Sequence, residues 1–526
     1  MRSHGISLLA GAAAVTAFAP VDAWPLAPLA LALLFAQWHE ARSWQIASTL
    51  GFAFGLGFFL GGVSWVYVSM HTYGDMAAPL AALATLAFCA GLALFPATAG
   101  ALVARLTPRG PLRLLAACGA WVLLDAARAL PFNGFPWLAM GYSQIETPLA
   151  GLAPLLGVHG VALGLSVGAA ALAWLGLRIR LEPLPQARPQ VPVHSLGGAM
   201  RTGNRLRAAL VTLTALGLAS SPWITGALTR NIPWTVAVGQ PVSVALIQGN
   251  IAQDLKFDPA QYARTLEHYA RAIEATQARL VVLPETAVPR MADAVDPAWW
   301  TRVRNHALRT GADVLVGVPT GDLAHRYFNS VISLGTSPGQ VYSKRHLVPL
   351  GEYIPAGFDW ILQVLHVPMS AFSPGPDDGP ALAVAGERVG VNICYEDAFG
   401  SEIIRALPEA SLLVNVSNIA WFGDSLAPGQ HLQMSRMRAL ETGRDMLRAT
   451  NTGMTAIVRS DGTTQALPPF VAGTLEGHAQ GREGMTPYAR MGNAPAIGLA
   501  LAFLVLAAAL AHRSPSGSTA PRDESR

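Results

Sequence analysis

The chain has 526 residues, of which 52% are hydrophobic and 13% are charged, and its formal net charge is +4. Soluble domains usually carry about 25% charged residues, so this composition excludes an ordinary soluble protein, a disordered chain and a disulfide-stapled secreted module. The 36 basic residues include only two lysines, Lys256 and Lys344, and the arginines are scattered or flank apolar runs. A nucleic-acid binder clusters its basic residues into a stripe with aromatic residues between them, so we expect no nucleic-acid partner.

Eight apolar runs reach or approach the length of about 20 residues that a helix needs to cross a bilayer. The first two runs are short and could form one helical hairpin. The first run also resembles a signal peptide with a cleavage site near residue 19, but a second apolar run follows it almost at once. The runs are 5–18, 24–37, 46–70, 77–106, 112–130, 149–177, 208–228 and 492–511.

The loops between these runs differ in charge, which predicts an orientation. Arginines occur in the loops after runs two, four and six and after run eight, whereas the loops 71–76 and 131–148 contain no Lys or Arg. The positive-inside rule then predicts that both termini are cytoplasmic and that the segment between runs seven and eight faces the periplasm of a bacterial inner membrane. We therefore divide the chain into seven membrane helices (1–230), a periplasmic domain (231–490), a last membrane helix (491–512) and a cytoplasmic tail (513–526), with a Pro-, Gly- and Arg-rich cytoplasmic linker at 182–204.

The periplasmic segment has a different composition, in which short β-branched runs alternate with helical patterns. Strands alternating with helices indicate a layered α/β domain, and about 250 residues suffice for a full core. The predicted helices are 262–277, 299–309 and 430–446. The predicted strands are 242–248, 280–284, 313–318, 330–334, 389–393, 412–416 and 455–458.

Three residues with useful chemistry follow predicted strands of this domain. Glu285 comes after an apolar strand and a proline, Lys344 lies in a Ser-Lys-Arg-His segment, and Cys394 ends another apolar strand. Ligand sites of open α/β sheets form at such strand ends. Taken singly, each residue has an ordinary explanation: a solvated carboxylate, a surface charge and a small core residue.

The combination favours a site. A chain that uses arginine almost everywhere retains a lysine where a compact ammonium is needed. A lone cysteine is unexpected in an oxidising compartment unless its thiol is used. The three cysteines contain no CxxC pair, so we expect no zinc site, no disulfide framework and no cofactor.

Glu, Lys and Cys in this order, each at a strand end, resemble the triad of the nitrilase, or carbon–nitrogen hydrolase, superfamily. Together with the membrane runs, the chain resembles the apolipoprotein N-acyltransferase family within it. The resemblance implies about eight transmembrane helices and a nitrilase-like αββα sandwich. It rests on the segments QGN at 248–250, 347–355, ICYE at 393–396, WFG at 421–423, 433–441, PYAR at 487–490, FPWL at 135–138 and GYSQ at 141–144.

The resemblance implies a ping-pong acyl transfer at the surface of the lipid bilayer, as the last step of lipoprotein maturation. The donor is the sn-1 acyl chain of a phospholipid, preferably phosphatidylethanolamine. The acceptor is the α-amino group of the S-diacylglyceryl-cysteine at the N-terminus of an apolipoprotein. Cys394 would be the nucleophile that carries the thioester, Glu285 the general base and Lys344 the oxyanion partner, in a chain that we expect to be a monomer.

The resemblance also suggests residues around the triad. Glu352 would orient Lys344 or the attacking amine, although an exposed turn carboxylate is the alternative, and Tyr395 and Glu396 would shape the pocket of the nucleophile. The apolar stretch 350–372 suggests a lid that dips into lipid, or else a satellite core cluster. The substrate-contacting candidates are Phe257, Tyr353, Phe358, Trp360 and Trp421.

Two other functions stay open at this point. A membrane-anchored amidase would hydrolyse a C–N bond with the same three residues but would need no lipid-facing arm. A transporter with a degenerate outer domain has only Asp125 and Arg128 in its favour, three residues apart in one run. The chain departs from the family pattern at Ile419 and at Phe257, and we expect the neighbouring Lys256 at the surface, with contact to a lipid phosphate as the alternative.

Overall fold

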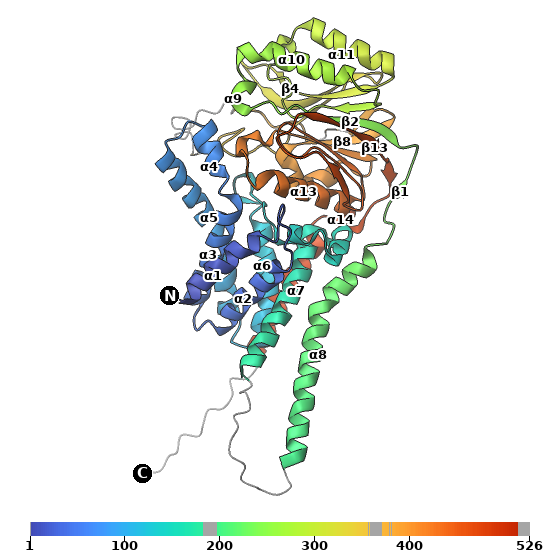
Figure 1. Cartoon of the computed structure of the whole chain (residues 1–526). Helices are drawn as coiled ribbons and strands as arrows, with labels where there is room; N and C mark the ends of the chain where they lie inside the picture. The colour runs from blue at the N-terminus through green and yellow to red at the C-terminus, as the bar shows by residue number, and fades with distance from the viewer. Residues whose placement is uncertain are drawn as a thin grey trace.

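The computed structural model describes residues 2–181, 197–355, 357, 371–377, 379 and 381–513. Within these residues, all eight apolar runs contribute to helices that lie below the sheets in Figure 1. The helices are α1 (Arg2–Val15), α2 (Leu26–Glu40), α3 (Trp44–Val63), α5 (Ala78–Leu106), α6 (Pro111–Ala127), α7 (Ala153–Leu181), α8 (Gly197–Thr229) and α15 (Ala494–Arg513).

Among the described residues, four helical segments are long and apolar enough to cross a membrane: Trp44–Val63, Ala78–Leu106, Pro148–Ile179 and Ala494–Arg513. Helices α1, α2 and α6 have 14, 15 and 17 residues, which makes them short for a span. The predicted number of eight spans is therefore not confirmed. The predicted linker is partly wrong, since residues 197–204 begin α8, and 182–196 lie outside the described residues.

Glycines allow the apolar helices to approach closely. A Cβ on Gly51 of α3 would lie 2.2 Å from the Pro96 carbonyl oxygen of α5, and a Cβ on Gly119 of α6 would lie 2.2 Å from the Ala500 carbonyl oxygen of α15. Helices in lipid associate through van der Waals packing, which small residues at the contact improve. The helices of the bundle therefore pack with their backbones in close contact at these glycines.

Two six-stranded sheets form the part of the chain above the bundle. In both sheets the three central strands are parallel, namely β2–β3–β4 and β8–β9–β10, and the outer pairs are antiparallel. The first sheet has the order β13 (Gly473–Ala479), β2 (Val242–Gln248), β3 (Leu280–Val282), β4 (Asp313–Gly321), β5 (Tyr327–Gly335) and β6 (Val341–Ser343). The second has the order β12 (Thr464–Ala466), β11 (Ala456–Val458), β10 (Met446–Thr450), β9 (Leu412–Ser417), β8 (Glu387–Ile393) and β7 (Leu382–Val384).

Helices cover both outer faces of the paired sheets. Apolar side chains of the two inner faces form one core, which includes Leu246, Val282, Val391 and Val414. Helices α10 (Pro259–Glu274) and α11 (Pro297–Thr310) pack on the outer face of the first sheet, and α13 (Ala427–Thr442) lies under the second (Figure 1). The predicted αββα sandwich is confirmed.

Most predicted elements of the sandwich form close to their predicted positions. All seven predicted strands exist, but the longer strands β10 and β13 were missed, and so were the strands of two or three residues at 236–237, 341–343, 382–384, 464–466 and 482–483. The helix predicted over 430–446 ends at Thr442, because Gly443 takes a left-handed conformation with φ of 64° that stops it. Residue 446, which was predicted to end this helix, begins β10 instead.

Candidate active site

The three predicted residues follow the ends of three strands. Glu285 lies three residues after β3, while Lys344 and Cys394 directly follow β6 and β8. Strands β3 and β6 belong to one sheet and β8 to the other, so the site lies where the two sheets face each other. The α/β topology thus gathers residues that are more than 100 positions apart in the chain.

The Glu285 carboxylate is buried, and both of its oxygens accept hydrogen bonds. Oε1 accepts a hydrogen bond of 2.7 Å from Asn329 Nδ2 and lies 3.4 Å from Lys344 Nζ, and Oε2 accepts a bond of 2.7 Å from the Asn418 amide. Burial alone would raise the pKa of Glu285, but the two lysine ammoniums and these donors outweigh it and lower the pKa. The group is therefore a carboxylate at neutral pH, ready to accept a proton.

Lys344 lies between two carboxylates. Its Nζ donates a hydrogen bond of 2.8 Å to Glu352 Oε1, in addition to the Glu285 contact. Burial would lower the pKa of the fully buried lysine, but Glu352 and Glu285 raise it. Glu352 is itself fixed, since Asn329 Nδ2 donates 3.0 Å to its Oε1 and the Val348 amide donates 2.8 Å to its Oε2. The ammonium is therefore permanently charged and held in one place.

Cys394 is half-buried, and its backbone is strained. Its φ is +52°, a left-handed conformation that non-glycine residues rarely adopt. Its carbonyl accepts hydrogen bonds from Asn415 Nδ2 (3.2 Å) and His431 Nε2 (3.3 Å). Burial and the Glu285 carboxylate raise the pKa of the thiol to about 12, against smaller effects of Lys344 and Ser417 that lower it. The thiol is therefore protonated at rest and needs a base in order to attack.

A buried polar network lies next to Cys394. Asp397 binds His431 Nε2 at 2.6 Å and Arg448 Nη1 at 2.9 Å, and Arg448 Nη2 donates 2.8 Å to His431 Nδ1. Arg448 also donates to Asn415, which holds the Cys394 carbonyl. Because each group is buried and paired, the network fixes the turn that presents the thiol.

Glu396 joins the segment around Lys344 to the segment around Cys394. Its carboxylate accepts hydrogen bonds from the Arg345 amide (2.7 Å), the His346 amide (3.1 Å), the Ile393 amide (2.7 Å) and the Tyr342 hydroxyl (2.8 Å). Burial raises the pKa of Glu396, and the backbone amides partly offset this effect. The segments on either side of the site are thereby held at a fixed spacing.

Tyr395 joins the site to the helical bundle. Its hydroxyl donates 2.7 Å to the carbonyl of Gly134, and its ring stacks on Phe135, with 6.5 Å between centroids. His346 Nε2 lies 2.6 Å from the carbonyl of Asn133 in the same loop. The loop between α6 and α7 therefore contacts both the segment around Cys394 and the segment around Lys344.

The substrate-contact candidates are only partly described. Phe257, Tyr353 and Trp421 are half-buried. The Trp421 carbonyl accepts a hydrogen bond of 2.8 Å from Ser69, and its ring lies edge-on to Tyr73 of the bundle. Phe358 and Trp360, with most of the predicted lid, lie outside the described residues. Among the described residues nearby, the Phe372 amide donates a hydrogen bond of 2.9 Å to the Glu352 carbonyl.

Sequence reasoning missed three residues of the site. Asn329 lies within β5 and Asn418 just after β9, where amides carry no pattern that marks them as functional. Lys256, at the end of α9 (Gln253–Lys256), was expected at the surface, and this prediction is wrong. It is only 4% exposed, and its Nζ donates 3.1 Å to the Glu285 carbonyl. The rarity of lysine in the chain was the signal that could have identified it.

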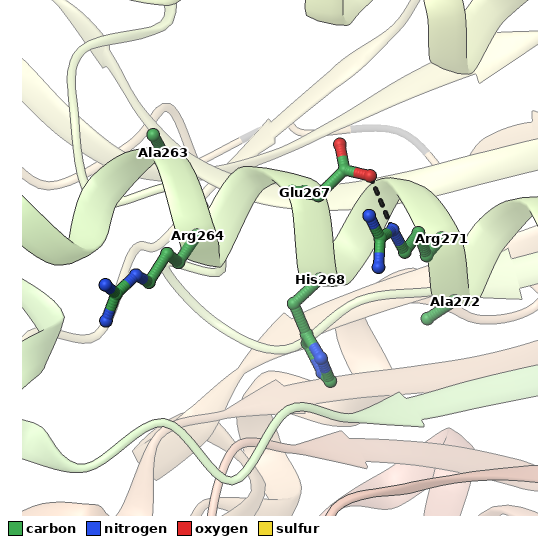
Figure 2. Close-up of a pocket in the computed structure, with 6 residues that line it drawn as sticks. All are labelled: Ala263, Arg264, Glu267, His268, Arg271 and Ala272. Carbon is green, nitrogen blue, oxygen red and sulfur yellow. Dashed lines mark hydrogen bonds and ion pairs between the residues drawn. The ribbon is translucent and has the colours of Figure 1, made fainter.

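A shallow depression on α10 has no part in this site. Figure 2 shows that its lining side chains come from successive turns of one helix, where Glu267 pairs with Arg271. This helix lies on the outer face of the first sheet, whereas the site residues lie between the sheets.

Family models match both parts of the chain. Residues 10–171 match the family model described as the apolipoprotein N-acyltransferase N-terminal domain, and residues 243–481 match the carbon–nitrogen hydrolase model. The apolipoprotein N-acyltransferase of Nitrosomonas europaea is 44% identical, with 95% of this chain and 96% of the relative covered. That of Ralstonia nicotianae is 42% identical, with 98% and 94% covered. A crystal structure of a carbon–nitrogen hydrolase from Helicobacter pylori is 16% identical, with 48% of this chain and 93% of the other covered and a TM-score of 0.36.

Proposed function

The chain belongs to the apolipoprotein N-acyltransferase family, and we propose that Cys394, Glu285 and Lys344 carry out its acyl transfer through a thioester on Cys394. The chain is thus an acyltransferase with a carbon–nitrogen hydrolase fold and apolar helices suited to a membrane. Its substrates are a phospholipid donor and a lipoprotein acceptor. The more specific proposal is the sn-1 chain of phosphatidylethanolamine as donor group and the amino group of an N-terminal S-diacylglyceryl-cysteine as acceptor.

One observation carries the proposed mechanism. Glu285 Oε1 lies 3.4 Å from Lys344 Nζ, both side chains are buried, and both charges act on the half-buried Cys394 thiol. A base, a cation and a protonated nucleophile are the parts that a covalent acyl transfer needs. Each has a defined protonation state at neutral pH, because the environment moves the pKa of Glu285 down and that of Cys394 up.

In the first half-reaction, the thiol attacks the carbonyl carbon of the phospholipid ester. Glu285 accepts the thiol proton as the C–S bond forms, so a free thiolate never has to accumulate. The carbonyl oxygen of the ester becomes an oxyanion, which Lys344 and the Tyr395 amide stabilise. When the C–O bond breaks, Glu285 returns the proton to the departing alkoxide, and the lysophospholipid leaves an acyl group on Cys394.

In the second half-reaction, the neutral N-terminal amine of the lipoprotein attacks the thioester carbon. Glu285 accepts a proton from this amine, and Lys344 again faces the oxyanion. The C–S bond then breaks, the amide is released, and the proton on Glu285 returns to the sulfur. An amine must outcompete water at this step, and a site next to the bilayer favours it by limiting water access.

The remaining assignments complete the proposal. Glu352 holds Lys344, while Tyr395 and Glu396 hold the nucleophile turn. The substrate contacts proposed are Phe257, Tyr353, Phe358, Trp360 and Trp421. The chain is proposed to act as a monomer in the bacterial inner membrane, with both termini in the cytoplasm, residues 231–490 in the periplasm and membrane helices in 1–230 and 491–512.

Transfer between two defined substrates tests this function. The purified chain in detergent receives phosphatidylethanolamine labelled in its sn-1 chain together with a synthetic diacylated lipopeptide. We expect label in the triacylated lipopeptide, and none with Cys394→Ala. Label that appears only as free fatty acid, at the same rate with and without lipopeptide, would instead identify a hydrolase.

A further inference from the structure

Both lysines of the chain meet at the same carboxylate residue. Lys344 approaches the Glu285 side chain, and Lys256 Nζ donates 3.1 Å to the Glu285 carbonyl from the other side. Lys256 is 4% exposed, although burying an ammonium is expensive unless nearby groups compensate it. The mechanism described above gives this second buried cation no task.

The short helix that ends at Lys256 reaches Glu285 a second time. Gln253 Oε1 accepts 2.8 Å from Asn418 Nδ2, and the Asn418 amide donates 2.7 Å to Glu285 Oε2. Helix α9 is therefore connected to the main chain of Glu285 through Lys256 and to its carboxylate through Asn418. A change at Lys256 can move the general base or change its charge environment.

The charges around Glu285 balance only when Lys256 is included. The site has two carboxylates, Glu285 and Glu352, and Lys344 contacts both of them. Without Lys256, these two carboxylates would share one lysine ammonium. The other ionisable groups that interact electrostatically with this pair are the Cys394 thiol, which acts on Lys256, and the Arg448 guanidinium, which acts on Glu285. Like charges at one site favour protonation of one of them, and the second cation counters this effect at Glu285, whose pKa both lysine ammoniums lower.

We propose that Lys256 is a positioning residue for the general base: it holds the Glu285 main chain in place and keeps the carboxylate ionised until it accepts the Cys394 proton. This inference deepens the proposed function and rests on it for the role of Glu285. Burial lowers the pKa of Lys256 to about 8, so the cation is present across the neutral range and is lost at more alkaline pH.

Alkylation of Cys394 by iodoacetamide tests the inference without any lipid. The sulfur attacks the methylene carbon, iodide leaves, and Glu285 accepts the thiol proton, so the rate should fall as pH drops through the pKa of Glu285. The rate is measured from pH 4 to pH 9 by peptide mass mapping at Cys394. Lys256→Met and Lys256→Gln should move the midpoint of this acid limb upward by about one pH unit, since a nearby opposite charge lowers a carboxyl pKa by roughly that amount or more. Lys256→Arg should leave the midpoint unchanged.

The variants separate charge from position. Gln can still donate to the Glu285 carbonyl but carries no charge, whereas Met fills the space and does neither. Gln253→Met is the matched control on the same helix, which removes a buried hydrogen bond and should change the rate without moving the midpoint. If both neutral variants retain the wild-type midpoint, whatever their rates, Lys256 is only structural and the inference is overturned. Failure of the wild-type chain to transfer acyl groups would refute the proposed function, while the alkylation profile would still decide the role of Lys256.

Discussion

Replacing Lys344 by arginine keeps the positive charge at this position but changes the geometry of its hydrogen-bond donors. The ammonium lies 2.8 Å from Glu352 Oε1 and 3.4 Å from Glu285 Oε1, and its side chain is 1% exposed. An arginine keeps the positive charge but spreads it over a planar fork with five donors. This fork would pair with the two carboxylates and would not present one donor to the developing oxyanion.

The expected loss follows from the role of that donor. Removal of one oxyanion donor typically lowers the rate by about 10²–10³-fold, or about 2.7–4 kcal/mol of transition-state stabilisation. We therefore expect Lys344→Arg to form the acyl-enzyme about a hundredfold more slowly than the wild type. The larger side chain in a packed site also destabilises the fold by about 1–3 kcal/mol, which an unfolding midpoint measures separately.

The assay is the single-turnover rate at which an acyl group from phosphatidylethanolamine appears on the enzyme, followed by intact mass. The opposite exchange, Arg302→Lys, is a control at a partly exposed ion pair on α11 and should leave this rate unchanged. If Lys344→Arg acylates at the wild-type rate, neither the oxyanion role of Lys344 nor the argument from lysine usage is correct.

Three further predictions concern the groups that hold the site. Asn329→Leu removes the hydrogen-bond donor shared by Glu285 and Glu352. The midpoint of the acid limb in the pH profile of acyl-enzyme formation should therefore move upward by about one pH unit. An unchanged midpoint would mean that Asn329 has no electrostatic role. In the wild type, the pKa of Glu285 is lowered, so the acylation rate should stay constant from neutral pH down to about pH 5.5 and decline only as pH falls through that pKa. A decline centred above pH 6 would contradict the claim that the two lysine ammoniums lower the pKa of this carboxylate. Tyr395→Phe leaves the buried Gly134 carbonyl without its hydroxyl donor and should lower the free energy of unfolding by about 1–3 kcal/mol in a denaturant titration, whereas an unchanged midpoint would show that this contact is not stabilising.

The sequence pattern predicted the layers of the fold well, because apolar runs and short β-branched runs report burial directly. The prediction failed for strands that contain no continuous apolar run. Strand β13 is an edge strand in which only Leu475 and Ala479 are buried, so it lacks a continuous apolar run. Strand β10 contains Arg448, a buried charge that makes sense only next to Asp397, which lies 51 positions earlier.

The site was predictable to the extent that its residues follow strands. Glu285, Lys344 and Cys394 could be proposed because strand ends host ligand sites and because lysine is rare in the chain, and the structure places them where the two sheets meet. Asn329 could not be found, since an asparagine inside a strand has no signal until the pairing of β4, β5 and β6 is known. The contact between Tyr395 and Gly134 joins parts of the chain 261 residues apart, and no local pattern predicts it.

The central claim is that Cys394 carries the acyl group between donor and acceptor. The most direct measurement is the mass of the wild-type chain after incubation with phosphatidylethanolamine and no acceptor, with the modified residue located by peptide mapping. The account predicts one acyl group on Cys394 that hydroxylamine removes, that the diacylated lipopeptide discharges, and that Glu285→Gln fails to acquire. An acyl group on any other residue, or equal labelling of Cys394→Ala, would contradict it.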